Sequence, residues 1–336
     1  MPQSPDHMDA AVLHTHGEPV RMSRVPRPAL GPGEVLVRVE ASGVNPLDTK
    51  IVAGAAPHAR VRRLPAILGV DLAGVVEAVG EDVTGFGAGD AVYGMTGGVG
   101  DVPGSLAEYA AVDARLLAVR PHRWTARQAA TVPLSVITAW EGLVDRAQVG
   151  AGQKVLVHGG AGGVGHIAVQ VAVARGARVY ATGSAGAQAT IAGLGAVAID
   201  YRAMAPAEYV DVYTAGDGFD VIFDTIGGAT LDASFASVRP YVGHVVSILG
   251  WGAHSLAPLS FRGATYSGVF TLLPLLTGQG RERHGDILRA AAELADGGRL
   301  TPRVDPRQFA LDTAHLAHEA VASGTADSKI VVDVPR

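Results

Sequence analysis

The three glycines whose spacing indicates chemistry most directly are Gly160, Gly162 and Gly165, which form the pattern GxGxxG. An apolar run, VLVH, precedes them and HIAVQVAVA follows, so we expect the pattern to join a strand to a helix. In that setting the first glycine permits a tight turn, the second lets the backbone approach a pyrophosphate, and the third lets the helix pack on the strand. The phosphate would lie at the positive end of the helix dipole. The sequence therefore predicts a dinucleotide-binding loop made of Gly160, Ala161, Gly162, Gly163, Val164 and Gly165; the alternative is a turn that merely joins the two elements.

The end of the next predicted strand, residues 178–182, bears on which nucleotide binds. A site for NAD places an Asp or Glu there, roughly 20 residues past the glycine motif, to bind the ribose hydroxyls. This chain has Gly183 and Ser184 instead. Their small size leaves room for a 2′-phosphate, which favours NADPH. The alternative is a loop that accepts either nucleotide, because Gln188 stands nearby and no lysine supplies a cation for the phosphate.

Metal chemistry has few possible ligands in this sequence. The chain has no cysteine, which excludes disulfides, thiolate zinc sites, iron–sulfur clusters and cysteine nucleophiles. Its 12 histidines show no HxxxH or HExxH spacing. We therefore predict no metal site.

Charge and hydropathy exclude two kinds of partner. The net charge is −5 and no dense Lys/Arg stripe is present, so we expect no nucleic-acid partner. No run reaches the roughly 18–20 apolar residues of a spanning helix, and the first eight residues contain no apolar signal segment, so we expect no membrane partner and a cytoplasmic location.

The length of 336 residues favours two domains, because domains commonly hold roughly 100–200 residues. Short alternating strands over residues 10–119 predict a β-barrel-like domain. From residue 152 onward strands alternate with helices, which predicts a parallel α/β sheet. The segment after residue 272 is too small for its own core and should return to the first domain. We expect a flexible tail at 1–8, a catalytic domain of 9–127 and 270–336, and a nucleotide-binding domain of 128–269.

Many short motifs carry a family resemblance from about residue 10 to residue 334. They are GEVLVR from Gly33, GVNPLD from Gly43, GVDLAGVVEAVG from Gly69, GDAVYG from Gly89, GSLAEY from Gly104, VPL from Val132, TAW from Thr138, HGGAGGVG from His158, FDVIFDTIGG from Phe219 and KIVV from Lys329. In this order they resemble the zinc-independent medium-chain dehydrogenases/reductases, in the quinone oxidoreductase and enoyl reductase-like branch. The resemblance implies an α/β protein: a GroES-like β-barrel catalytic domain plus a Rossmann domain with a doubly wound parallel sheet that binds NADPH, with the active cleft between them.

The resemblance also implies roles for individual residues. It places Asn45 beside the nicotinamide ribose, Thr138 on the amide side of the cofactor, and Gly227 and Gly250 close under the ring. Tyr201 matches the family's 2′-phosphate pocket, where Ser184 could also donate. The alternatives are structural: Asn45 could cap a turn before Pro46, and Thr138 could be an ordinary residue near a helix N-terminus.

The same resemblance bears on zinc. Zinc-dependent relatives carry a cysteine where this chain has Asn45, and Gly-His-Glu where it has Gly69, Val70 and Asp71. Three ligand positions are therefore lost. We expect Asp71 to be a hydrogen-bonded partner between the domains.

A metal-free site suits acceptors that need little polarisation. The predicted reaction is hydride transfer from NADPH to a small hydrophobic carbonyl substrate that is conjugated: an enone, an enoyl thioester or a quinone. Lys50, Tyr93 and Thr138 are candidate hydrogen-bond donors to the developing enolate. The alternatives are an NADPH-binding structural or sensor protein with little catalysis, and a zinc-dependent alcohol dehydrogenase.

A homodimer is the expected assembly, because family relatives pair through an edge strand of the Rossmann sheet. The candidate segments are residues 242–249 and 263–272.

Overall fold

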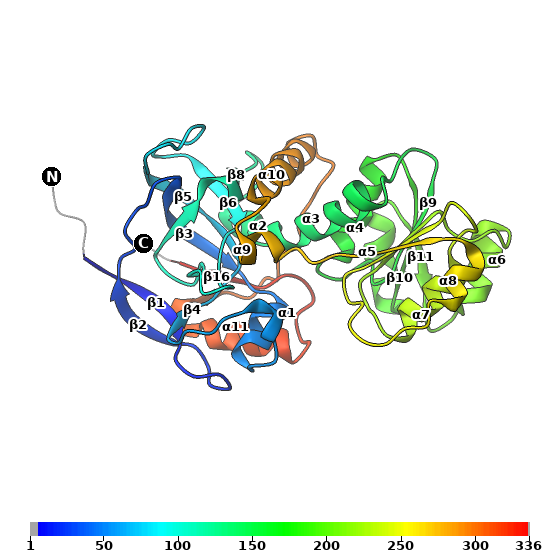
Figure 1. Cartoon of the computed structure of the whole chain (residues 1–336), viewed down its shortest axis with the longest axis horizontal. Coiled ribbons are helices and arrows are strands. Elements are labelled where there is room, and N and C mark those ends of the chain that lie inside the picture. Colours follow the sequence, from blue (N-terminus) through cyan, green and yellow to red (C-terminus); the bar gives the residue numbers. More distant parts are fainter. Residues whose placement is uncertain (1–5, 335–336) are drawn as a thin grey trace. The chain divides into compact units, whose positions relative to one another are not determined.

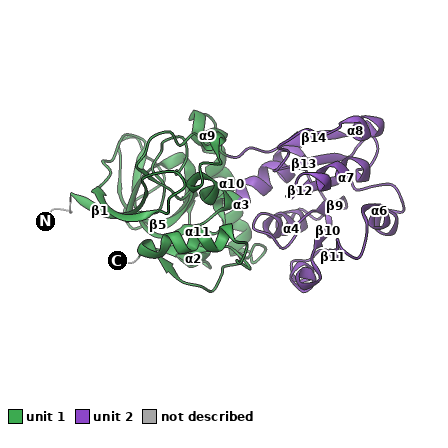
Figure 2. Ribbon diagram, turned by 90° about the horizontal axis from the view of Figure 1, so that it is seen from below, with its two compact units in different colours: residues 1–134, 272–336 green, residues 135–271 purple. Residues whose placement is uncertain are grey.

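The computed structural model describes residues 6–334, which form two compact units. Unit 1 comprises residues 1–134 and 272–336, and unit 2 comprises residues 135–271 (Figure 2). Of the expected flexible tail, residues 1–5 lie outside the described part. His7 and Met8, which belong to the same expected tail, instead pair with Pro26 and Val25, and Met8 is buried. The apolar side chain of Met8 explains why the strand begins before residue 9.

Unit 1 is built mainly from antiparallel strands. Its seven-stranded sheet has the order β15-β16-β3-β5-β6-β8, with β7 also paired to β3; a three-stranded sheet has the order β2-β1-β4. The bounds are β1 (His7–Leu13), β2 (Arg21–Pro26), β3 (Glu34–Gly43), β4 (Ala66–Ile67), β5 (Asp71–Val79), β6 (Ala91–Met95), β7 (Tyr109–Asp113), β8 (Leu117–Val119), β15 (Phe309–Ala310) and β16 (Val331–Asp333). Because β16 pairs with β3, the C-terminal segment completes the sheet of the N-terminal segment.

Unit 1 also contains helices, several of which pack against these sheets. They are α1 (Pro46–Val52), α2 (Ala126–Ala130), α9 (Leu273–Thr277), α10 (Arg281–Asp296) and α11 (Ala314–Ala322). The helix α1 follows β3 after two residues and packs beside α11 (Figure 1). Proline at the first position of α1 suits a helix start, because its missing N–H has no helical acceptor there.

Unit 2 contains one six-stranded parallel sheet of order β11-β10-β9-β12-β13-β14. Its strands are β9 (Lys154–Val157), β10 (Arg178–Gly183), β11 (Val197–Asp200), β12 (Val221–Asp224), β13 (His244–Ser247) and β14 (Thr265–Gly268). All four residues of the central strand β12 are buried, as expected for a parallel strand covered on both faces. This arrangement confirms the prediction of a doubly wound Rossmann sheet.

Helices flank the parallel sheet of unit 2. They are α3 (Pro133–Trp140), continued by a π-helical segment (Glu141–Arg146), then α4 (Gly165–Ala174), α5 (Gln188–Gly193), α6 (Pro206–Thr214), α7 (Ala229–Ser237) and α8 (Ala257–Arg262). On one face Leu156, Ile222 and Val245 share an apolar cluster with side chains of α6, α7 and α8. That cluster supports the strand ends where the predicted site residues lie.

One expected edge segment is interior. Residues 242–249 include β13, which is hydrogen-bonded to β12 on one side and β14 on the other. Only β14, inside the second expected segment, lies at that end of the sheet. The correction follows from strand order, which the alternation of residue types does not specify.

Among the helices of the described residues, none is long and apolar enough to cross a membrane.

Candidate functional site

Five predicted nucleotide-binding positions follow consecutive strands of the same sheet. Because the strands are parallel, their carboxyl ends lie along one edge, where ligands of such sheets bind. The positions are the loop Gly160 to Gly165 after β9, Ser184 after β10, Tyr201 after β11, Gly227 after β12 and Gly250 after β13. The chain reverses direction across the sheet between β9 and β12, which makes the loop after β9 the switch point of the fold.

The glycines of the loop differ in backbone conformation and in the space around them. The left-handed backbone lies at Gly159, with φ +73°, and not at Gly160, where the motif predicts the tight turn. A Cβ added at Gly160 would lie 2.5 Å from the Cβ of Ala181, and one at Gly165 would collide with the Gly159 carbonyl. At Gly162 the nearest atom to an added Cβ is the Gly159 carbonyl oxygen, at 3.2 Å, and the residue is exposed. The surface of the loop therefore stays open at Gly162.

The start of α4 offers donors to an anion. The backbone amides of Gly163 and Val164 donate to no carbonyl within residues 6–334. Such amides, together with the helix dipole, favour a phosphate group. The loop thus has the open surface and the donors that a pyrophosphate requires.

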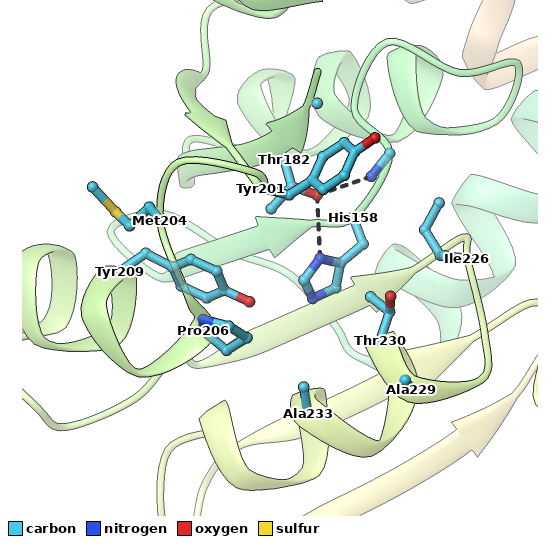
Figure 3. Close-up of a pocket in the computed structure, with 12 residues that line it drawn as sticks. His158, Thr182, Tyr201, Met204, Pro206, Tyr209, Ile226, Ala229, Thr230 and Ala233 are labelled. Atoms are coloured by element: carbon cyan, nitrogen blue, oxygen red, sulfur yellow. Dashed lines mark hydrogen bonds between the residues drawn. The ribbon is translucent and has the colours of Figure 1, made fainter. Parts of the chain in front are cut away.

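A cavity of about 420 Å³ opens beside this loop in unit 2 (Figure 3). Its lining residues come from α6 and α7 and from segments at or after the ends of β9, β10, β11 and β12. They are His158, Gly159, Thr182, Gly183, Tyr201, Met204, Pro206, Tyr209, Ile226, Ala229, Thr230 and Ala233. The volume lies within the range of small-molecule pockets.

His158, which directly follows β9, is buried in this cavity at 3% exposure. Its Nδ1 lies 3.2 Å from the hydroxyl of Thr182, and that hydroxyl accepts a hydrogen bond from the amide of Gly159. Its Nε2 has no hydrogen-bond partner in the described part of the chain. Burial lowers the pKa of His158 to about 4, so the imidazole is neutral at physiological pH.

The turn after β12 is held by a buried carboxylate. Asp224 accepts hydrogen bonds from the amides of Ile226 and Gly227 and from the hydroxyl of Ser247. A Cβ at Gly227 would approach the Leu249 carbonyl to 2.5 Å, and one at Gly250 would collide with the Tyr266 hydroxyl. The backbone therefore requires glycine at Gly227, whereas a side chain at position 250 would displace the end of the Tyr266 side chain.

A positively charged side chain that the sequence analysis did not predict, that of Arg202, follows the end of β11. Asp200 pairs with Gly183 across the two strands, so Tyr201 and Arg202 follow β11 where Ser184 follows β10. The guanidinium of Arg202 lies 5.6 Å from the ring centroid of Tyr201 and forms no ion pair within the described residues. The expected position for a cation was that of Gln188, whose side chain instead bonds to the carbonyls of Gly183 and Ser184. A signal for Arg202 was present in the sequence, because parallel strand order places residues after β11 beside those after β10.

Unit 1 places Asn45 in a buried polar cluster. The Asn45 side-chain amide donates to Asp71 Oδ2 at 2.9 Å, and its oxygen accepts a hydrogen bond from the ammonium of Lys329. The same ammonium lies 3.5 Å from Asp71 Oδ2. Asp71 Oδ1 accepts a hydrogen bond from the amide of Leu134 in α3, and the expectation that Asp71 is a hydrogen-bonded partner between the domains stays a prediction. Asn45 does precede α1, but its side chain bonds to the cluster and does not cap the helix.

The three candidate donors to an enolate lie in different settings. Tyr93 is fully buried, and its hydroxyl donates to the Leu288 carbonyl at 2.6 Å. We therefore correct its assignment: Tyr93 is a core residue whose hydroxyl is already bonded. Lys50 is exposed near the end of α1, whereas Thr138 is buried within α3.

The zinc-ligand positions of the resemblance do not fit a zinc ion. Asp71 is committed to three partners, Asn45 supplies a neutral amide, and the Lys329 ammonium already provides the positive charge beside them. Nor do the described residues bring three His, Cys, Asp or Glu side chains together in a group that could hold a metal. We derive no step that involves zinc.

Comparison with known proteins agrees with this architecture. Residues 31–122 match the family described as alcohol dehydrogenase GroES-like domain, and residues 194–332 match the family described as zinc-binding dehydrogenase. The chain therefore belongs to the medium-chain dehydrogenase/reductase superfamily.

The relatives include reductases of two plants. The chain is 33% identical over 318 residues to a 2-methylene-furan-3-one reductase of Solanum lycopersicum, covering 92% of this chain and 74% of that protein. The same figures hold for a chloroplastic NADPH-dependent alkenal/one oxidoreductase of Arabidopsis thaliana. Other relatives are multidomain: the chain is 34% identical to the polyketide synthase system protein NorB of Streptomyces orinoci but spans only 13% of its length.

Solved structures match the whole chain. An alcohol dehydrogenase superfamily protein from Novosphingobium aromaticivorans is 53% identical with a TM-score of 0.95, over 98% of this chain and 100% of that one. A quinone oxidoreductase from Coxiella burnetii is 27% identical with a TM-score of 0.82, with the same coverage.

Proposed function

We propose that this chain is an NADPH-dependent reductase that transfers hydride to a conjugated carbonyl acceptor without a metal ion. The acceptor is an enone, an enoyl thioester or a quinone, of small size and apolar character. The observation that carries the proposal is the buried cluster of Asn45, Asp71 and Lys329. The Lys329 ammonium lies beside Asn45 and Asp71, at positions where zinc-dependent relatives carry metal ligands. Conjugated acceptors are suited to such a site because their negative charge spreads onto a carbonyl oxygen without a Lewis acid.

Nucleotide binding is assigned to the strand ends of unit 2. When bound, NADPH supplies the hydride. The backbone amides of Gly163 and Val164 would donate hydrogen bonds to the pyrophosphate. The side chains of Arg202, Tyr201 and Ser184 would bind the 2′-phosphate. Arginine favours a phosphate through charge-assisted hydrogen bonds. The NADPH-dependent plant relative supports the same nucleotide.

Asn45 is the residue we propose beside the nicotinamide ribose. One N–H of its amide donates to Asp71 and its oxygen accepts from Lys329, so the amide has one fixed orientation. The remaining N–H is the group left to meet a ligand. Lys50 and Thr138 stay as proposed donors to the substrate oxygen, and the six residues of the glycine loop, Gly227 and Gly250 stay as proposed nucleotide contacts.

The deciding experiment measures turnover with both nicotinamide nucleotides against a panel of enones, enoyl thioesters and quinones, before and after prolonged chelation. We expect reduction of at least one acceptor class with NADPH, and unchanged rates after chelation. Loss of activity on chelation that added zinc restores would return the chain to the metal-dependent dehydrogenases. Binding of NADPH with no oxidation by any acceptor would instead favour a structural or sensor role.

The cofactor preference is tested at Arg202. We expect Arg202→Ala to weaken NADPH binding by about tenfold and to leave NADH binding unchanged, because only NADPH carries the phosphate. Titration by nucleotide fluorescence measures both affinities, and Arg262→Ala, on α8, is the matched control. Equal affinity of the unmodified protein for the two nucleotides would contradict the preference.

The assembly we propose is a homodimer that pairs through β14, the edge strand of the unit 2 sheet. Near this edge Tyr241 and Phe261 are each 88% exposed and Val242 is 68% exposed, and Tyr241 bonds to the backbone at Arg262. Exposed aromatic side chains beside an edge strand suit a symmetric contact. The cytoplasmic location expected from the sequence stays a prediction.

A further inference from the structure

The cavity of unit 2 has a mouth and a closed end of different character. At the mouth lie Tyr201 and Ile226, each 53% exposed, next to the strand-end residue Gly183. At the closed end lie His158 and Tyr209, each 3% exposed. A nucleotide whose ribose sits at the strand ends therefore directs its base toward His158 and Tyr209.

One buried polar atom at the closed end, Nε2 of His158, has no hydrogen-bond partner within residues 6–334. Two hydroxyls also line the cavity, those of Tyr209 and of the half-buried Thr230. Figure 3 shows the Tyr209 hydroxyl directed toward the imidazole, with Thr230 on the other side. A buried polar atom normally has a partner, so the unpartnered Nε2 of His158 points to a ligand that supplies one.

The hydrogen bonds around Thr182 determine which nitrogen of His158 carries the proton. The Thr182 oxygen accepts the Gly159 amide, and the one acceptor within reach of its own hydrogen, in the described part of the chain, is His158 Nδ1. A buried hydroxyl hydrogen without an acceptor is unfavourable, so Nδ1 accepts and Nε2 carries the hydrogen. Burial keeps this imidazole neutral, since it lowers the pKa of His158 to about 4. The cavity therefore presents a fixed N–H donor at its closed end.

The walls around this donor suit a flat ring. Ile226 and Pro206 supply apolar surface, while Ala229 and Ala233 leave space along α7. In a purine nucleotide the edge farthest from the sugar carries N1 and the substituent at C6, so that edge reaches the closed end first. Adenine presents there an acceptor at N1 and a donor at its 6-amino group.

We propose that His158, with Tyr209 and Thr230, selects adenine as the base of the dinucleotide by donating Nε2–H to N1, while a hydroxyl accepts from the 6-amino group. This proposal deepens the proposed function and rests on it. Hypoxanthine carries a hydrogen on N1 and an oxygen at C6. Its N1–H would face the Nε2–H of His158, and two donors cannot form a hydrogen bond with each other. The pocket should therefore discriminate against the hypoxanthine analogue of NADPH.

The test compares the dissociation constants of NADPH and its hypoxanthine analogue for the full chain. We expect the unmodified protein to bind NADPH about tenfold more tightly, as for one lost hydrogen bond. His158→Phe should bring the ratio close to one, while His158→Gln, which retains an N–H donor, should keep a preference. His244→Phe, at the opposite ends of the strands, is the matched control and should keep the full ratio.

A second variant tests which ring nitrogen of His158 carries the hydrogen, without changing His158 itself. Thr182→Val keeps the shape of the side chain but removes the hydrogen bond to Nδ1, so His158 can present either a donor or an acceptor. We expect this variant to bind both nucleotides with similar affinity.

The outcomes separate the two proposals. A ratio near one in the unmodified protein, or a full ratio retained in both His158→Phe and Thr182→Val, would overturn base selection while leaving an NADPH-dependent reductase intact. Failure of the unmodified protein to bind NADPH would overturn the proposed function and the base selection with it.

Discussion

Asp48 shows how burial changes the behaviour of a single residue. Its Oδ2 accepts the Asn45 amide at 2.8 Å, while its Oδ1 is buried with no hydrogen-bond partner within the described residues. Burial raises the pKa of Asp48 to about 7; the nearby Asp71 raises it further, and the Asn45 amide and Lys329 oppose the shift. The folded chain therefore holds a proton on this carboxyl that the unfolded chain releases near its ordinary pKa.

The first prediction concerns the pH dependence of stability. Because the folded-state pKa of Asp48 is raised, its contribution is fully present below about pH 4 and is lost as the pH rises to about 7, by up to about 4 kcal/mol. Asp48→Asn has no such proton to lose, so its free energy of unfolding should exceed that of the unmodified protein at pH 8 and approach it near pH 4. Urea unfolding of both proteins across this range measures the difference.

The exposed Asp312→Asn serves as the control, since the same chemical change on the surface should leave the pH profile unaltered. A constant difference between Asp48→Asn and the unmodified protein from pH 4 to pH 8 would contradict a raised pKa at Asp48.

At the scale of elements, the loop between β9 and α4 combines rigid packing with an open surface. Gly160 and Gly165 are fixed by contacts with Ala181 and Gly159, whereas Gly162 faces open space with one neighbouring atom at 3.2 Å. A side chain at Gly162 can therefore be added with little change to the fold, but it would occupy the position of a pyrophosphate.

We predict that Gly162→Val abolishes binding of NADPH and NADH while the protein stays folded. Gly193→Val, at the end of α5, adds the same side chain where no atom lies within 4 Å of the new Cβ, and it should bind normally. Calorimetric titration measures both variants, with circular dichroism as the check on folding. Retained affinity in a folded Gly162→Val protein would place the nucleotide away from this loop.

Assembly is a property of the complete molecule. We predict a particle of twice the 34.4 kDa chain mass in light scattering at micromolar concentration. Phe261→Asp should shift the protein toward the monomer, because a charge beside β14 would be buried without a partner in the dimer. Val119→Asp makes a similar change at an exposed position of β8 and should leave the dimer intact. A monomeric mass for the unmodified protein would exclude pairing through β14.

Local patterns of the sequence determined the elements and their order. The strands β11 and β12 lie after residue 152, where the sequence predicts strands alternating with helices, because each is a short apolar run between turn residues. The glycine motif, the strand before it and the helix after it were also predictable, since all three lie in one continuous stretch of the sequence. The absence of cysteine likewise limited the metal chemistry through composition alone.

Contacts between distant residues could be decided only by the tertiary structure. Lys329 reaches Asn45 across 284 positions, and the Tyr93 hydroxyl reaches the Leu288 carbonyl across 195. No local periodicity encodes such pairs, because they depend on which strands become neighbours. The same reason explains why β13 is interior, why the residues after β11 follow a strand next to β10, and why His158 is buried at the end of a cavity.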